Sequence, residues 1–249
     1  MLSALNTPPT MPLELHPMTT ADTLSWTRVR ALAYLGPTHV LVHSGPISRA
    51  SVIEVAKDRK REIGKPNTWH WKVVDTDLST SPDDPPDNGG RTIAVAIWSA
   101  HNIPTTKVDG SSDPTSLPIE KAERNDEQPP FIPPEVRLDV LNAVLTPLRK
   151  AKTEIMGSKP YLMLNSLATH PEHHHKGAGS MLLEWGLRKA DEDGLDIYLD
   201  SSRLAKPLYE REGFEVMREI EFDRRPWGGE GIDWHGCMVR KPKAAGSHV

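Results

Sequence analysis

The sequence predicts a single domain of the α/β class, and three observations lead to this prediction. The chain has 249 residues, a length that suits one large domain or two small ones. Apolar, strand-like segments alternate with amphipathic, helix-like segments, most clearly from Tyr161 to Phe222, and this alternation is typical of α/β folds. No internal repeat of about 20–50 residues is present, which excludes solenoids and propellers. We therefore treat residues 1–249 as one domain.

Composition excludes several functional classes. The 30 Lys and Arg residues oppose 34 Asp and Glu residues, so the formal charge is −4, and we expect no nucleic-acid partner, because such binding depends on neutralising phosphates. No apolar run reaches the roughly 18 residues of a membrane span, and the N-terminal segment lacks the basic start and apolar core of a secretory signal. The single cysteine, Cys237, suits a reducing compartment. We expect a cytoplasmic protein without a membrane partner.

Proline is frequent, and its distribution indicates loop insertions. Ten of the 23 prolines lie between Pro82 and Pro134. Residues 77–90 are acidic and rich in turn-forming residues, and residues 104–133 carry few side chains that can pack in a core. Such composition does not offset the entropy cost of ordering a chain, so we expect two flexible insertions. A loop as long as the second one is either an insertion without a role or a lid over a binding site.

The first part of the chain contains one strand pattern and two helix patterns. Residues 13–15 are predicted to form a short strand. Residues 19–22 contain Thr and Asp side chains that can cap a helix running to about Tyr34. Ser48–Ile63 is charged and amphipathic, and we expect a second helix there.

The middle of the chain contains two strand patterns and one helix pattern. Residues 69–74 and 92–98 are rich in β-branched and aromatic side chains, so they are predicted to be neighbouring strands joined by the acidic loop. After the long insertion, apolar residues recur with the i, i+3, i+4, i+7 spacing of a helix. These residues are Leu141, Val144, Leu145 and Leu148.

The most informative segment begins at Tyr161. Tyr161–Thr169 is predicted to be a buried strand, and Gly177 and Gly179 follow it at the start of a helix for which Gly194 is the candidate C-cap. Small residues at this point let the backbone approach a ligand, and the N-terminus of a helix attracts phosphate. The apolar face of the predicted helix consists of Leu183, Leu187 and Ala190.

Neither common nucleotide motif fits this glycine turn. A Walker loop needs a lysine after its last glycine, whereas Lys176 precedes Gly177 and Gly179 here. A dinucleotide-binding fingerprint needs a glycine at the position that Leu182 occupies. The turn therefore either binds another phosphate ligand or has a structural role alone.

The downstream sequence resembles the GNAT superfamily of acyl-CoA-dependent N-acyltransferases, and most closely its fungal members. In that superfamily the pyrophosphate loop reads [QR]-x-x-G-x-[GA], and the matching stretch is His174–Gly179. A later element reads N-x-x-A-x-x-L-Y-x-x-x-G-F, and the matching stretch is Ser202–Phe214. The sequence departs from these patterns at His174, where Gln or Arg is usual, and at Ser202, where Asn is usual.

The resemblance implies a fold and an activity. The fold is a mixed central β-sheet of about six or seven strands flanked by helices, with residues 69–74, 92–98 and 233–240 in its outer parts. The activity is an N-acetyltransferase in which a primary amine of a small molecule attacks the thioester of acetyl-CoA directly. Three alternatives stay open: a catalytically silent CoA-binding sensor or scaffold, a different acyl-CoA donor, and a protein or alcohol acceptor. A homodimer also stays open.

The resemblance also implies roles for individual residues. Tyr209 matches the tyrosine that is placed to protonate the departing thiolate of CoA. Backbone groups around Leu167 and Thr169 would pair with the pantetheine arm like an added strand, and N–H groups from His175 to Ser180 would hold the pyrophosphate. The implied cofactor-binding residues are Leu167, Thr169, His174, His175, Lys176, Gly177, Ala178, Gly179, Ser180 and Ser202.

The remaining candidate residues are less tightly defined. Asp200, which follows a predicted strand, is the preferred general base, with His101 or water as alternatives. Four histidines, His170, His173, His174 and His175, could suggest a metal site. We expect none, because three consecutive imidazoles in one loop would point in different directions, whereas zinc ligands converge. We expect exposed loop histidines, with one near a CoA phosphate. Three tryptophans on the two upstream strands either line an acceptor pocket or pack in the core. They are Trp69, Trp71 and Trp98.

Overall fold

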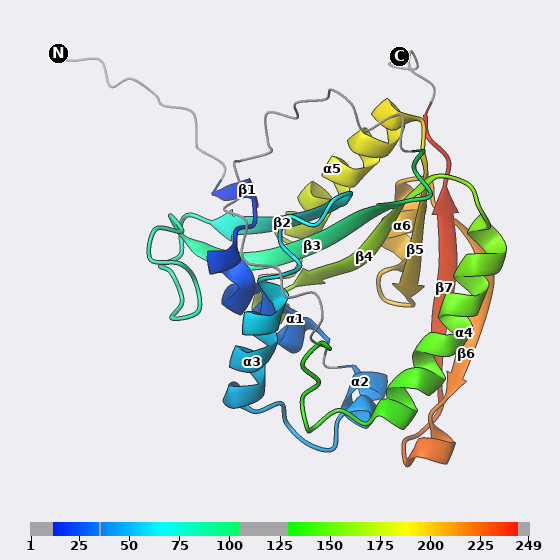
Figure 1. Ribbon diagram of the computed structural model, residues 1–249, viewed down its shortest axis with the longest axis horizontal. Helices are drawn as coiled ribbons and strands as arrows, with labels where there is room; N and C mark the ends of the chain where they lie inside the picture. Colours follow the sequence, from blue (N-terminus) through cyan, green and yellow to red (C-terminus); the bar gives the residue numbers. More distant parts are fainter. Residues whose placement is uncertain (1–11, 35, 105–128, 244–249) are drawn as a thin grey trace.

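Figure 1 shows the computed structural model, which describes residues 12–34, 36–104 and 129–243. Its seven strands form one sheet in the order β1-β2-β3-β4-β5-β7-β6. Only β4 and β5 are parallel, and every other neighbouring pair is antiparallel. The strands are β1 (Leu13–Pro17), β2 (Thr68–Asp75), β3 (Arg91–His101), β4 (Tyr161–Thr169), β5 (Asp196–Ser202), β6 (Glu215–Asp223) and β7 (Ile232–Arg240).

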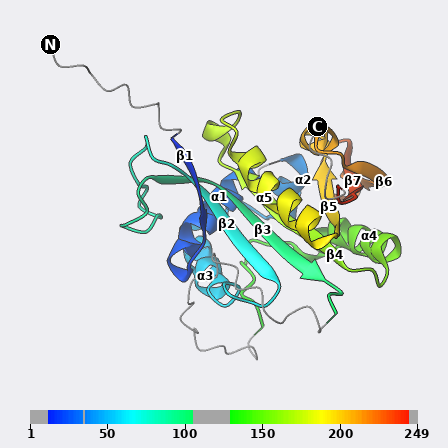
Figure 2. The ribbon, with the colours of Figure 1, turned by 90° about the horizontal axis from the view of Figure 1, so that it is seen from above.

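Helices cover both faces of the sheet. In Figure 1, α5 lies above β2, β3 and β4, α1 and α3 lie below them, and α4 runs beside β6 and β7. Figure 2, seen from above, shows α5 running in nearly the same direction as β2 and β3. None of the described helices is long and apolar enough to cross a bilayer. The helices are α1 (Thr23–Ala33), α2 (Pro37–Val42), α3 (Arg49–Arg59), α4 (Leu138–Met156), α5 (Ala178–Asp193) and α6 (Lys206–Arg211), with 3-10 turns η1 (Thr20–Asp22), η3 (Pro171–His173) and η4 (Arg225–Trp227).

The predicted α/β class and mixed sheet are confirmed. The strand predicted over Tyr161–Thr169 is β4 with the same bounds. The helix predicted after it is α5, and Gly194 ends it in the left-handed conformation, with φ 66°. The helix predicted over Ser48–Ile63 is shorter: α3 ends at Arg59, and the Ser48 hydroxyl caps it by accepting the N–H of Ser51 at 3.1 Å.

Residues 233–240 were expected in an outer part of the sheet, and they lie there. β7 is next to the edge strand β6, between it and β5, and the other edge strand is β1. It pairs with β6 on one side and completes the hydrogen bonding of β5 on the other. Leaving β5 as an edge would expose unpaired backbone groups.

The tryptophans of β2 and β3 belong to the core. Trp69, Trp71 and Trp98 surround Trp185 of α5, with ring centroids 5.6, 5.1 and 6.2 Å from the Trp185 ring. Trp98 is fully buried. These side chains therefore fill the interface between the sheet and α5 and do not line an acceptor pocket.

The structure describes the first predicted insertion in full and only the ends of the second. Residues 77–90 connect β2 to β3, and ion pairs hold this loop to two helices. Arg28 Nη2 of α1 lies 3.3 Å from Asp84 Oδ1, and Arg49 of α3 pairs with Asp83. Its flexibility stays a prediction. The insertion over residues 104–133 lies for the most part outside the described residues.

Candidate functional site

Strands β4 and β5 separate in the middle of the sheet. They are paired from Tyr161 to Leu164 on β4, and beyond that point β4 continues beside β3 whereas β5 continues beside β7. A bulge at Asn165 marks the separation, because Ile97 and Trp98 of β3 face Ser166 and Leu164. We call the space between residues 165–169 and 200–202 the strand gap.

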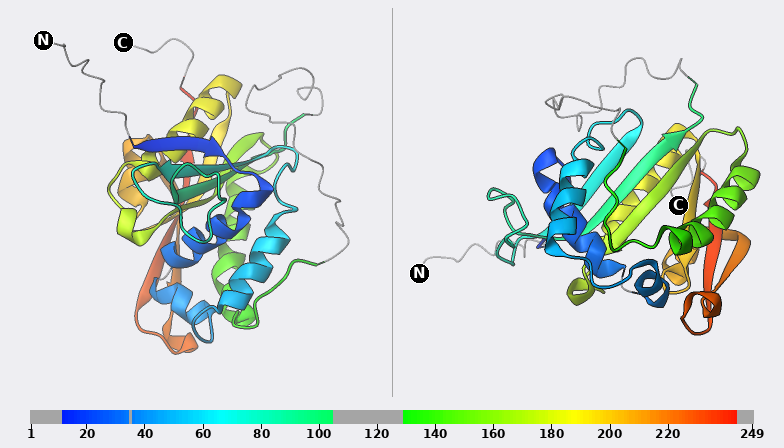
Figure 3. Two further views of the ribbon diagram at one scale, coloured as in Figure 1. Left: turned by 90° about the vertical axis from the view of Figure 1, so that its left-hand side faces the viewer. Right: turned by 60° about the horizontal axis from the view of Figure 1, so that its bottom comes forward.

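The strand gap leaves backbone groups available for a ligand. Each of these two segments is paired along one edge, and along the edge that faces the gap it has no strand partner among the described residues. Unpaired backbone groups need a partner from water or a ligand, and an extended ligand can occupy such an edge as an added strand. Figure 3 (right) shows β3 and β4 between α3 on one side and α4 on the other.

A phosphate-binding geometry adjoins the end of β4. His175 and Gly177 have positive φ values of 63° and 89°, and no side chain in the described part of the chain caps the N-terminus of α5. The first hydrogen bond of the helix runs from the Met181 N–H to the Gly177 carbonyl at 3.0 Å, so the preceding N–H groups have no helical partner. These groups and the helix dipole together favour an anion.

Gly179 lies between this helix terminus and β4. A Cβ atom at Gly179 would lie 3.6 Å from Thr169 Oγ1 and 3.7 Å from Leu167 Cδ2, which are ordinary contact distances. Protein packing therefore does not demand a glycine here. The structure also brings together Leu167, Thr169 and Gly179, which the sequence placed in one cofactor site.

Two basic side chains of the loop make contacts with the protein. Lys176 Nζ forms an ion pair with Asp75 Oδ2 at 2.9 Å, which directs the lysine toward the end of β2. His174 Nε2 lies 3.1 Å from the Thr169 carbonyl oxygen, and His175 is exposed. A cavity of about 430 Å³ adjoins Lys176 and Gly177 on the β1 side of α5.

Tyr209 of α6, a helix that packs against β5, is buried in the same apolar cluster as Leu182 of α5. Its ring packs edge-on against Phe214, with centroids 5.6 Å apart, and burial together with the nearby Tyr34 raises the pKa of its hydroxyl. The Tyr34 hydroxyl lies 3.1 Å from Ser166 Oγ, directly after the bulge of β4. The Tyr209 phenol thus stays protonated beside the strand gap.

Asp200 lies at the point where β5 leaves β4. The residue as a whole is exposed, but the surrounding protein partly desolvates its carboxylate, and this desolvation raises the pKa of the carboxyl group. The Tyr198 hydroxyl donates a hydrogen bond of 2.7 Å to Asp200 Oδ1, and this contact opposes the effect of burial. Ser202, at the end of β5, is exposed, and its hydroxyl accepts the Ala205 N–H at 3.3 Å.

His101 lies away from these groups. It is opposite Tyr161 in the β3–β4 ladder, at the paired end of β4, about four residues or roughly 13 Å along the strand from the bulge. Its ring stacks on Tyr161 with centroids 4.9 Å apart, and its Nε2 lies 2.8 Å from Ser99 Oγ. The structure therefore places Asp200, and not His101, beside the strand gap.

Three polar residues near the strand gap were not predicted. Tyr34 follows α1, and its ring centroid lies 5.0 Å from that of His39 on α2, whose pKa is lowered to about 4 by burial and by Arg30. His235 of β7 pairs with Ser202 in the strand ladder, and its Nε2 has no hydrogen-bond partner within the described ranges. No motif in their sequence segments identifies them.

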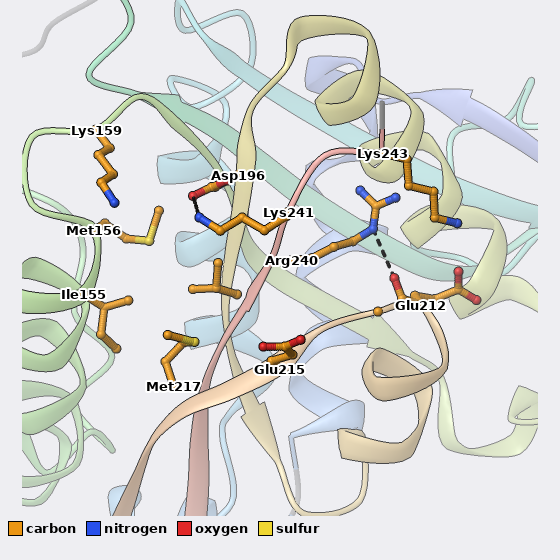
Figure 4. Close-up of a pocket in the computed structure, with 12 residues that line it drawn as sticks. Ile155, Met156, Lys159, Asp196, Glu212, Glu215, Met217, Arg240, Lys241 and Lys243 are labelled. Atoms are coloured by element: carbon orange, nitrogen blue, oxygen red, sulfur yellow. Dashed lines mark hydrogen bonds and ion pairs between the residues drawn. The ribbon is translucent and has the colours of Figure 1, made fainter. Parts of the chain in front are cut away.

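A second cavity, of about 370 Å³, lies at the other end of the sheet (Figure 4). It adjoins Asp196 at the start of β5, whereas the strand gap is at the end of that strand. Its apolar wall includes Ile155 and Met217. Lys241 pairs with Asp196 at 2.6 Å, so acidic and basic groups compensate one another there. This cavity is separate from the glycine turn and from Tyr209.

Comparisons with known proteins find similarity in the segment that holds the glycine turn. Residues 147–216 match the model of the acetyltransferase (GNAT) domain. A curated acetyltransferase from the fungus Stachybotrys chartarum is 29% identical over 84 residues, which are 34% of each chain. The matched stretch thus spans about a third of the length of that relative.

Two solved structures share the fold. The histone acetyltransferase HPA2 and related acetyltransferase of Corynebacterium glutamicum is 20% identical, with a TM-score of 0.52 over 94% of this chain and 99% of the other. A mosquito arylalkylamine N-acetyltransferase like 5b is 13% identical, with a TM-score of 0.56 over 92% of this chain and 99% of the other. The segment that holds the glycine turn thus matches the acetyltransferase (GNAT) domain model, and these structures share the fold of the chain.

Proposed function

We propose that the chain transfers the acetyl group of acetyl-CoA to a primary amine of a small molecule. One observation carries this proposal: the unpaired edge of β4 leads directly to the uncapped N-terminus of α5. A ligand with an extended amide arm and a pyrophosphate fits both features, because the strand edge pairs with the arm and the helix N–H groups hold the phosphates.

The cofactor-binding residues follow from this placement. Backbone groups at Leu167 and Thr169 pair with the pantetheine arm, and N–H groups of residues 175–180 donate to the pyrophosphate. The small size of Gly179 leaves room for the phosphates between α5 and β4. Lys176 contributes mainly by holding the loop against Asp75, because its ammonium group is already paired.

The residues around the strand gap supply the proton transfers of a direct attack. The amine nitrogen forms a bond to the thioester carbon, and the bond from that carbon to sulfur breaks. Tyr209 donates its proton to the departing thiolate, and burial keeps the phenol protonated until that moment. Asp200 accepts the proton that the amine loses, directly or through one water, and the raised pKa of its carboxyl favours this role.

The acceptor reaches the strand gap from the sheet face that carries α1 and α4. Tyr34 and Asp200 lie at this mouth, an aromatic ring and a carboxylate that suit an amine. The structural similarity to a protein named arylalkylamine N-acetyltransferase supports a small amine as acceptor. A cytoplasmic location fits this reaction, since Cys237 is a free, buried thiol that needs no oxidising compartment.

One observation favours a second function, in which the chain binds CoA without turnover. Ser202 occupies the position where the superfamily has Asn, and its hydroxyl already accepts a backbone N–H. His174, at the position of Gln or Arg, is likewise engaged with the Thr169 carbonyl. A CoA-binding sensor or scaffold would tolerate the loss of the side-chain contacts to the cofactor that the usual residues at these two positions make.

A thiol-release assay with acetyl-CoA and a panel of primary amines tests the proposal. We expect release with at least one amine, and we expect Tyr209→Phe to lower kcat by about ten-fold or more, because general acid catalysis contributes on the order of 10²–10⁴-fold. CoA affinity should be nearly unchanged in this variant. Tyr161→Phe is the matched control, since it removes a buried tyrosine hydroxyl at the paired end of β4 and should leave kcat intact.

The outcomes separate the alternatives. Tight CoA binding with no release for any amine would support the sensor function and exclude the enzyme. Release of the CoA thiol from another acyl-CoA only would show that acetyl-CoA is not the donor. Release only with a protein or an alcohol would show that the acceptor is not a small amine. Unaltered kcat in Tyr209→Phe would remove Tyr209 from the mechanism.

A further inference from the structure

The turn before the phosphate-binding loop brings three metal-ligand side chains together. His170, Glu172 and His173 lie in and beside η3, and one donor atom from each lies within 4.8 Å of the other two. Residues i and i+3 of a 3-10 turn are eclipsed, which places the rings of His170 and His173 next to each other, with centroids 5.1 Å apart. The trio contains two of the four histidines considered from the sequence, for which no metal site was expected, and adds Glu172.

His173 gives an independent reason to expect a ligand. Its side chain was expected in solvent but is buried, with 8% of its surface exposed. Neither Nδ1 nor Nε2 has a hydrogen-bond partner in the described part of the chain. Buried polar groups are normally satisfied, so an orphaned imidazole calls for a partner such as a bound ion.

We propose that His170, Glu172 and His173 bind one divalent transition-metal ion of the zinc type. Two imidazole nitrogens and one carboxylate oxygen form a donor set that suits Zn²⁺, and three protein ligands leave a fourth position for water. The bond from the Glu172 N–H to His170 Nδ1 is long, at 3.3 Å, so metal ligation replaces a weak interaction.

The position of this site connects it to the phosphate-binding loop. His173 directly precedes His174, whose imidazole contacts the Thr169 carbonyl, and the loop begins at His175. An ion bound at η3 fixes the start of the loop and adds positive charge near the pyrophosphate. Metal and CoA should therefore increase each other's affinity, and the two effects must be equal in size. This coupling rests on the proposed function, whereas metal binding does not.

Isothermal titration of the full-length chain with Zn²⁺ alone tests the site. We expect saturable binding of one ion per chain, and we expect His170→Gln and His173→Gln each to weaken it by about ten-fold or more, by analogy with the loss of supporting ligands. His175→Gln is the matched control, because it removes a neighbouring imidazole outside the trio and should leave the affinity unchanged. His170 is only partly buried, so its variant keeps the test valid if His173→Gln does not fold.

Two results would overturn the proposal. Absence of saturable binding to the wild-type chain would do so, and so would an equal loss of affinity in His175→Gln, which would assign the ion to the run His173–His175. Repeating the titration with CoA present tests the coupling. If zinc binds as expected but CoA does not bind at all, the proposed function fails and the metal site stands.

Discussion

Replacing Gly179 by alanine separates ligand binding from folding at the glycine turn. The new Cβ would meet Thr169 Oγ1 at 3.6 Å and Leu167 Cδ2 at 3.7 Å, so it fits without a clash. Alanine is favoured over glycine in helices by up to about 1 kcal/mol. We therefore expect the free energy of unfolding of Gly179→Ala to stay unchanged or to rise by up to about 1 kcal/mol.

The same substitution should weaken CoA binding strongly. The methyl group occupies the space between α5 and β4 into which the phosphates are proposed to fit. Displacing them disrupts one hydrogen bond to a charged group, which is worth roughly 1.5–3 kcal/mol. Because about 1.4 kcal/mol corresponds to a ten-fold change in affinity, we expect CoA to bind about 10- to 100-fold more weakly.

Isothermal titration with CoA and urea denaturation measure the two effects. Gly45→Ala is the matched control, because a Cβ there would meet nothing within 4 Å and Gly45 lies in a loop outside the site. Wild-type CoA affinity in a folded Gly179→Ala variant would refute the assignment of the glycine turn to phosphate binding. A marked loss of stability would refute the packing argument instead.

Three further predictions concern stability and reactivity. Gly186→Ala should lower the free energy of unfolding by about 1–3 kcal/mol, because its Cβ would meet the Trp98 ring at 2.2 Å; an unchanged urea midpoint would contradict this. Arg240 donates two hydrogen bonds of 2.8 Å to the Asp191 carboxylate, and they lower the pKa of that group. The ion pair therefore contributes its full stability above the pKa of Asp in the unfolded chain, about 4, and loses it as the pH falls through the lower pKa of the folded chain. Asp191→Asn should thus cost about 1–3 kcal/mol at about pH 7 and little at about pH 2, and a pH-independent difference between the urea curves would argue against the pair. Burial raises the pKa of the Cys237 thiol to about 11, so a thiol reagent should label it only after denaturation, and rapid labelling of the native chain would contradict its burial.

Local sequence patterns determined the elements around the glycine turn. The bounds of β4, the start of α5 and its cap at Gly194 follow from apolar runs, glycine positions and helical spacing, which depend on nearby residues. The same patterns, with the family resemblance, led to Tyr209 and Asp200 as candidate catalytic residues. Their roles stay predictions, although both side chains lie beside the strand gap.

Only the tertiary structure decided which distant segments meet at the site. Tyr34 lies next to Ser166, and Lys176 is paired with Asp75, because packing brings together residues that are far apart in sequence. The place of β7 between β5 and β6 likewise depends on which free strand edge remains after the other strands have paired. Such contacts leave no periodic signal in the chain. The sequence therefore identifies the ends of β4 and α5, whereas the groups that surround the strand gap are set by long-range packing.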